Sequence, residues 1–286
     1  MSDPKSTPRT VVPRLLGCLV LAGSAAGLMA APTGAAPLLG AGARPDLGAS
    51  LSRPAGTPGA AKLWLAQAEG GEGGEAGAVA NAPADLAFLA RLHLVEGHLR
   101  GAVALYRQGH VDEAIGVAYH PEAEMMDEVR DDLAARGLAD FSAQLDAVGA
   151  AMEAGAAPEA VEADLAKLEA AIAAAATSEA DDMRLRADAL VLLMRAAASD
   201  YATAIADPAA IDLVPFAEAH GFVMTAQARA AEFSAAADPA VAAAGQKMAD
   251  AVATTRALFA EPAVAADPGL LLAAAARIEL AASAVK

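Results

Sequence analysis

Residues 84–107 of the chain read ADLAFLARLHLVEGHLRGAVALYR, and this stretch decides the fold. Large apolar side chains recur along it every three or four residues, a spacing that gathers them on one face of an α-helix. These positions are Leu86, Leu89, Leu92, Val95, Leu99, Val103 and Tyr106. Gly109 follows, and glycine readily adopts the left-handed conformation that ends a helix. The stretch therefore predicts a long, broadly buried helix from about Asp85 to Arg107.

Proline and glycine divide the rest of the chain into further helical segments. A short helix is expected over 111–118, and His120-Pro121 is expected to begin the next one, which ends at Gly137. Ser178 is the expected cap of a long helix that runs to Ala206. Asp-Pro pairs at 207–208, 238–239 and 267–268 supply an acidic cap before a first-position proline.

The composition favours helices throughout. Hydrophobic residues make up 56% of the chain but aromatic residues only 3%, and alanine supplies much of the difference. Alanine is the best helix former, whereas strands favour β-branched and aromatic residues in alternation. We therefore predict an all-α domain over 84–286, an up-and-down bundle of about eight or nine helices. The sequence leaves open whether the bundle consists of two halves, residues 84–176 and 178–286.

The sequence of residues 1–83 predicts that the protein is exported. Residues 1–31 hold Lys5, Arg9 and Arg14 before an apolar, small-residue run, the layout of a secretory signal peptide. An uncleaved membrane anchor is the alternative. Residues 32–83 are rich in Gly, Ala and Pro and predict a disordered linker. The mature domain is expected in the periplasm.

The charge balance excludes one large class of partner. The formal net charge is −16, with 20 basic residues scattered among 36 acidic ones, so no basic surface for nucleic acid is expected. An acidic surface is compatible with cations. The chain also holds neither G-x-S-x-G nor H-E-x-x-H, and its one cysteine is Cys18, so we do not expect an enzyme.

The histidines are the residues most suggestive of chemistry. Four of the five lie between positions 93 and 120, and imidazole with carboxylate suits iron, zinc, copper or manganese. Helical spacing favours a site built from His98, His120 and Glu124, supported by Glu122. A second cluster is expected from two residues of one later helix, Glu218 and His220. The competing interpretation of each histidine is an ordinary surface or boundary residue.

Two stretches resemble known exported proteins. The segments GHL at 97–99 and AYHPEAE at 118–124 loosely resemble exported proteins of alphaproteobacteria. The segments SDYATAI at 199–205 and EAHGF at 218–222 resemble periplasmic helical segments attached to some bacterial iron permeases. The resemblance implies an exported helical component that works near metal uptake.

Imelysin-like periplasmic iron-binding proteins are a more distant comparison. They are α-helical and carry the motif G-x-H-x-x-E. Here His110 and Glu113 have that spacing, but glycine stands immediately before the histidine rather than two positions before it. This departure prevents a direct transfer of ligands from that family.

Together these patterns predict a periplasmic metal-binding protein associated with iron or copper handling. Its expected partners are a transition-metal ion and a membrane permease or other envelope protein. The alternative is a non-catalytic helical scaffold that docks an envelope partner, which would leave an exposed apolar surface and no converging ligands.

Overall fold

The computed structural model describes residues 77, 79–179, 181–207, 210–260 and 266–285. The predicted signal peptide and the predicted linker up to residue 76 lie outside these residues. Within the described ranges all regular structure is helical, which confirms the all-α prediction. None of the described helices combines the length and the apolar character needed to cross a membrane.

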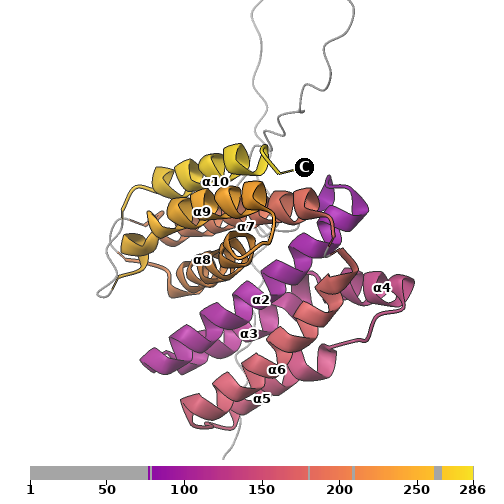
Figure 1. The fold of residues 1–286 in the computed structure, drawn as a ribbon. Helices are drawn as coiled ribbons and strands as arrows, with labels where there is room; N and C mark the ends of the chain where they lie inside the picture. Colours follow the sequence, from indigo (N-terminus) through magenta and orange to yellow (C-terminus); the bar gives the residue numbers. More distant parts are fainter. Residues whose placement is uncertain (1–76, 78, 180, 208–209, 261–265, 286) are drawn as a thin grey trace, which may run out of the picture. The chain divides into compact units, whose positions relative to one another are not determined.

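The described residues form nine α-helices, labelled α2 to α10 in Figure 1. The helices are α2 (Ala84–Gln108), α3 (Val111–Glu124), α4 (Met126–Arg136), α5 (Ser142–Glu153), α6 (Pro158–Ala176), α7 (Met183–Ala204), α8 (Leu213–Ser234), α9 (Pro239–Ala253) and α10 (Gly269–Ala282). Two short 3₁₀ turns, η1 (Thr177–Glu179) and η2 (Arg256–Phe259), complete the structure.

The helices pack in two groups that follow the order of the chain (Figure 1). In the first group α2, α3, α5 and α6 each pack against the next, and α6 returns to α2. In the second group α7 packs against α8, α8 against α9 and α9 against α10, and α10 returns to α7. The groups meet where α2 packs against α7 and α8 and where α3 touches α8. Helix α2 is therefore buried on nearly all sides, as its broad apolar stripe requires.

Glycines allow α2 and α8 to approach at backbone distance. A Cβ atom on Gly221 would overlap the carbonyl oxygen of Gly97 and lie 2.7 Å from the backbone nitrogen of Gly101. A Cβ on Gly101 would in turn lie 2.8 Å from the carbonyl carbon of Ala217. These distances are shorter than real Cβ contacts, so the crossing needs hydrogen at these positions. This close crossing fixes the register of α8 against α2.

The predicted boundary at His120-Pro121 is wrong. Helix α3 continues through Pro121 and ends at Glu124, and the break comes at Met125. Proline costs a helix one hydrogen bond. Pro121 is buried, and burial of its apolar ring offsets part of that cost. As a result His120 and Glu124 lie on one face of the same helix, one turn apart.

The predicted cap at Ser178 is also wrong. Residues 177–179 form the turn η1, and α7 begins at Met183, where the Asp182 carboxylate accepts the backbone N–H of Leu185. Aspartate caps helices as well as serine does, and Asp182 lies nearer than Ser178 to the apolar residues of α7. The Asp-Pro prediction at 238–239 is confirmed, because Asp238 accepts the backbone N–H groups of Ala240 and Val241.

We predict that the substitution Gly221→Ala destabilises the protein by about 1–3 kcal/mol, because the new methyl group overlaps backbone that cannot move aside. The measurement is urea unfolding followed by circular dichroism. Gly116→Ala is the matched control, since a Cβ there has nothing within 4 Å. Gly116→Ala should instead raise the free energy of unfolding by about 0.5–1 kcal/mol, because alanine favours a helix more than glycine does. Equal unfolding midpoints for Gly221→Ala and the wild type would contradict the close crossing.

Candidate metal centre

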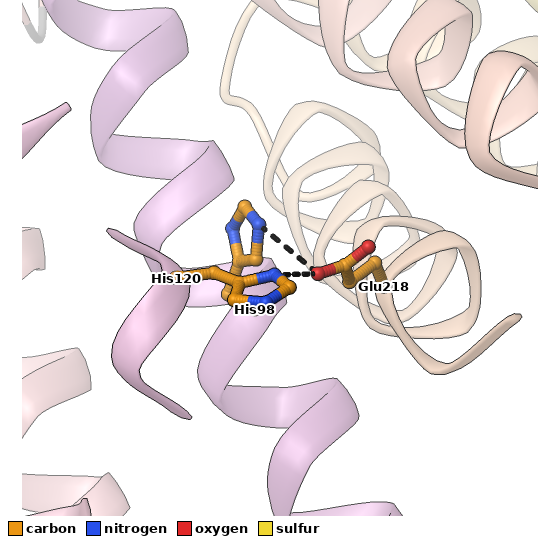
Figure 2. Close-up of side chains that lie close together, drawn as sticks. All are labelled: His98, His120 and Glu218. Carbon is orange, nitrogen blue, oxygen red and sulfur yellow. Dashed lines mark hydrogen bonds and ion pairs between the residues drawn. The ribbon is translucent and has the colours of Figure 1, made fainter. Parts of the chain in front are cut away.

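Three side chains from three helices converge where the two helix groups meet (Figure 2). His98 on α2, His120 on α3 and Glu218 on α8 each offer a ligand atom, and these atoms all lie within 4.8 Å of one another. We call them the His-His-Glu cluster. Among the described residues it is the one set of three or more His, Cys, Asp or Glu side chains with this geometry.

His98 is fully buried and held by the backbone. Its Nδ1 lies 2.9 Å from the carbonyl oxygen of Leu94, which can only accept, so Nδ1 carries the proton. In the neutral ring the lone pair is then on Nε2. This atom lies 3.8 Å from Glu218 Oε1 and 3.9 Å from Glu124 Oε2. The α2 backbone therefore turns the Nε2 lone pair of His98 toward two carboxylates.

Burial lowers the pKa of His98, although the nearby Glu218 carboxylate and the Leu94 carbonyl oppose this effect. The imidazole is therefore neutral at neutral pH. Only the neutral ring has a lone pair available for a metal ion. The buried position thus suits His98 to coordination and not to a permanent ion pair.

His120 differs from His98 because 36% of its side chain is exposed. Its Nδ1 pairs with Glu218 Oε1, and this hydrogen bond raises the pKa of His120. The charges of Glu124 and Asp200 raise it further. Asp200 lies on α7, so a fourth helix adds an acidic group that acts on His120.

The spacing of the donors is compatible with a small cation. Zinc and similar ions bind nitrogen and oxygen at roughly 2.0–2.2 Å, which places neighbouring donors of a tetrahedral site about 3.4 Å apart. The separations of 3.8 and 3.9 Å around His98 Nε2 are only slightly longer. Two imidazoles and one carboxylate leave coordination positions open, a set found with iron(II) and with zinc.

The structure brings together part of the site that the sequence predicts. His98 and His120 lie together, whereas Glu124 approaches His98 Nε2 at 3.9 Å but is not among the residues whose ligand atoms all lie within 4.8 Å of one another. Glu122 does not join them, because it points from the opposite side of α3 and pairs with Arg130 at 3.0 Å. Metal binding by the assembled residues stays a prediction.

The expected second cluster of Glu218 and His220 does not form. Glu218 turns toward α2 and α3 and completes the first cluster. His220 lies two residues further along α8 and faces a different direction, where its ring stacks on Phe259 with centroids 4.8 Å apart. The prediction grouped Glu218 with His220 because they are close in sequence, whereas residues two apart on a helix point to different sides.

The remaining histidine–glutamate pairs form no cluster of this kind. His93 and Glu96 are both buried on α2. Glu96 accepts a hydrogen bond from Arg229 of α8 at 2.6 Å and forms an ion pair with Arg100 at 2.9 Å. Arg100 also reaches Glu169 of α6 at 2.9 Å. This buried ionic network joins α2 to its neighbours on both sides, a structural role.

The comparisons with known proteins add no relative. Protein-family models, curated proteins and solved structures were all searched, and none matches this chain. The resemblance to periplasmic segments of iron permeases therefore stays a prediction.

His93 generates a pH prediction. Burial, helped by the charges of Arg229 and Arg186, lowers its pKa from 6.5 to about 3. The unfolded chain therefore takes up a proton below pH 6.5 that the folded chain refuses until about pH 3. The stability associated with neutral His93 is present above pH 6.5 and is lost as the pH falls through this window.

Neutral His93 should make the free energy of unfolding of the wild type fall by about 1.4 kcal/mol for each pH unit once the pH is well below 6.5. We expect the substitution His93→Leu to remove this contribution to the slope. The measurement is the urea unfolding free energy of both proteins at several pH values between 6.5 and 4.5. The slope is the readout, because the substitution also changes core packing. Parallel pH profiles would show that His93 is not kept neutral by the fold.

Proposed function

We propose that this protein binds one divalent transition-metal ion through His98, His120 and Glu218, with Glu124 as a fourth ligand. The observation that carries the proposal is the meeting of two imidazoles and a carboxylate from three helices, with ligand atoms within 4.8 Å. Donors from α2, α3 and α8 that point at one position are the arrangement by which helical bundles hold metal ions.

The orientation of His98 supports a cation rather than a hydrogen-bonded pair. Its Nε2 lone pair lies 3.8 Å from the Glu218 carboxylate and 3.9 Å from the Glu124 carboxylate. Each of these three groups can donate a lone pair to a cation. The Nδ1–H bond to the Leu94 carbonyl is the outer-shell contact that typically orients a metal-bound histidine.

The ligand types indicate the class of ion. Imidazole and carboxylate suit iron(II), zinc and copper(II), whereas copper(I) prefers thiolate and thioether sulfur. The His-His-Glu cluster contains no sulfur donor. We therefore propose a divalent ion, with iron or copper(II) as the physiological candidates. His120 and Glu124 are each about one-third exposed, so the site is accessible from the α3 side.

The cellular setting of the proposal comes from the sequence. The secretory signal expected over residues 1–31 and the resemblance of 199–222 to segments of iron permeases support a periplasmic role in metal handling. In that role the protein would hold an ion that a membrane permease or another envelope protein then receives.

A second candidate function is a docking module for an envelope partner. It is favoured by leucines on the outer face of α10, where Leu272 is 57% exposed and Leu280 75% exposed. Solitary exposed leucines are common on protein surfaces, however, and large contiguous patches are the better sign of an interface. The converging ligands therefore make metal binding the stronger candidate.

We expect isothermal titration of the purified chain with iron(II), zinc and copper(II) to give one tight site, and Glu218→Gln to weaken it more than about 100-fold. The amide keeps the shape of the carboxylate but loses its charge. Glu122→Gln is the matched control, because Glu122 pairs with Arg130 and should leave the affinity unchanged. Equal affinities of the wild type and Glu218→Gln would refute the proposal.

Glu124→Gln should have a smaller effect than Glu218→Gln, a loss of about tenfold in affinity, because Glu124 is more exposed and farther from the other ligands. The same titration measures it. A loss as large as that of Glu218→Gln would make Glu124 an essential ligand, and an unchanged affinity would remove it from the site.

A further inference from the structure

A hollow of about 400 Å³ lies beside the crossing of α2 and α8, away from the His-His-Glu cluster. It is bordered by the C-terminal end of α2, the N-terminal half of α8 and the turn η2. Its main side chains are Leu105, Gln108, His110, Phe216, His220 and Phe259. We call it the aromatic hollow. Its volume falls within the range of pockets that bind small organic molecules, about 300–1,000 Å³.

Rings are concentrated at this hollow in a chain that has few of them. The whole sequence contains six Phe, three Tyr and one Trp. The Phe259 ring lies 5.4 Å from that of Phe216 and 5.5 Å from that of Tyr201. The His220 imidazole stacks on Phe259 with an interplanar angle of 11°. The Phe216 and Phe259 rings that border the hollow are inclined by 57°, so they form an angled corner in which a planar ring can stack on one and meet the other edge to face.

The rim of the hollow adds polar groups of a particular kind. His110, His220 and Gln108 are side chains that can both donate and accept hydrogen bonds in their neutral forms. No Lys or Arg borders the hollow among the described residues, so nothing there favours an anionic group over a neutral one. A hydroxyl group, which also donates and accepts, matches this rim.

We propose that the aromatic hollow binds an uncharged planar aromatic molecule that carries a hydroxyl group. Its ring system lies against Phe259 and Phe216, and its hydroxyl faces Gln108 and the imidazole of His110. The site is separate from the metal centre. Ala217 borders the hollow and Glu218 belongs to the cluster, so successive residues of α8 serve the two sites.

The test is an NMR titration of the full chain with 2-naphthol. Its saturated analogue, decahydro-2-naphthol, has the same hydroxyl but no flat ring. Stacking between aromatic rings is worth about 0.5–1.5 kcal/mol beyond buried area, so 2-naphthol should bind up to about tenfold more tightly. The anionic 2-naphthoate should bind no better than 2-naphthol. Equal binding of the planar and saturated alcohols, or preference for the anion, would overturn the proposal.

Two substitutions of alanine by leucine, one at the hollow and one elsewhere on the surface, test where 2-naphthol binds. Ala104 borders the hollow, and Ala104→Leu should fill it and abolish 2-naphthol binding. Ala166 is exposed on α6, and Ala166→Leu should leave binding unchanged. Circular dichroism verifies that both variants fold. Binding that survives Ala104→Leu, or that is lost equally in both variants, would contradict this location.

The metal titration is an independent readout. Ala104→Leu should retain full metal affinity, because Ala104 contributes nothing to the cluster. Failure of 2-naphthol to bind a chain that still binds metal would overturn only the aromatic site. Failure of metal to bind a chain that still takes up 2-naphthol would overturn only the metal site.

Discussion

The backbone contact between α2 and α8 is the constraint on which the rest of the structure depends. Gly221 of α8 packs on the backbone of Gly97 and Gly101, Gly101 packs on the backbone of Ala217, and the Phe222 ring fills the space beside Gly97. His98 and Glu218 flank this contact, so the distance between imidazole and carboxylate is set by the glycines beside them. Any larger residue would separate the helices and the donors together. The candidate metal centre is therefore a product of helix packing as much as of its own side chains.

The buried charges on α2 reinforce this crossing. Glu96 is fully buried, and burial raises its pKa, while the guanidinium groups of Arg229 and Arg100 oppose that rise. Removal of one partner would leave a charge buried without compensation, which is costly. Arg229 lies on α8 two turns beyond Gly221, so the ion pair and the glycines require the same register. Two independent constraints thus act on one helix pair.

The sequence predicted the elements better than it predicted their contacts. The apolar period of α2 and the Asp-Pro start of α9 are local signals, and the structure has both. The grouping of Glu218 with His98 depends on which face of α8 meets α2, a long-range choice. One signal could have indicated it: glycines four apart at 97 and 101, and a further glycine in EAHGF. The continuation of α3 through Pro121 likewise separates Glu122 from Glu124, because residues two apart point to opposite sides of a helix.

The order of the ligands along the chain has a consequence for how the protein matures. His120 and Glu218 are separated by 98 positions, and the whole first helix group and α7 are synthesised before Glu218 exists. A growing chain that ends before α8 presents two histidines but lacks the carboxylate that faces them. Contacts so distant in sequence form late, once the loop between them has closed. An ion at this position would be captured by a finished bundle and could not act as a template for its assembly.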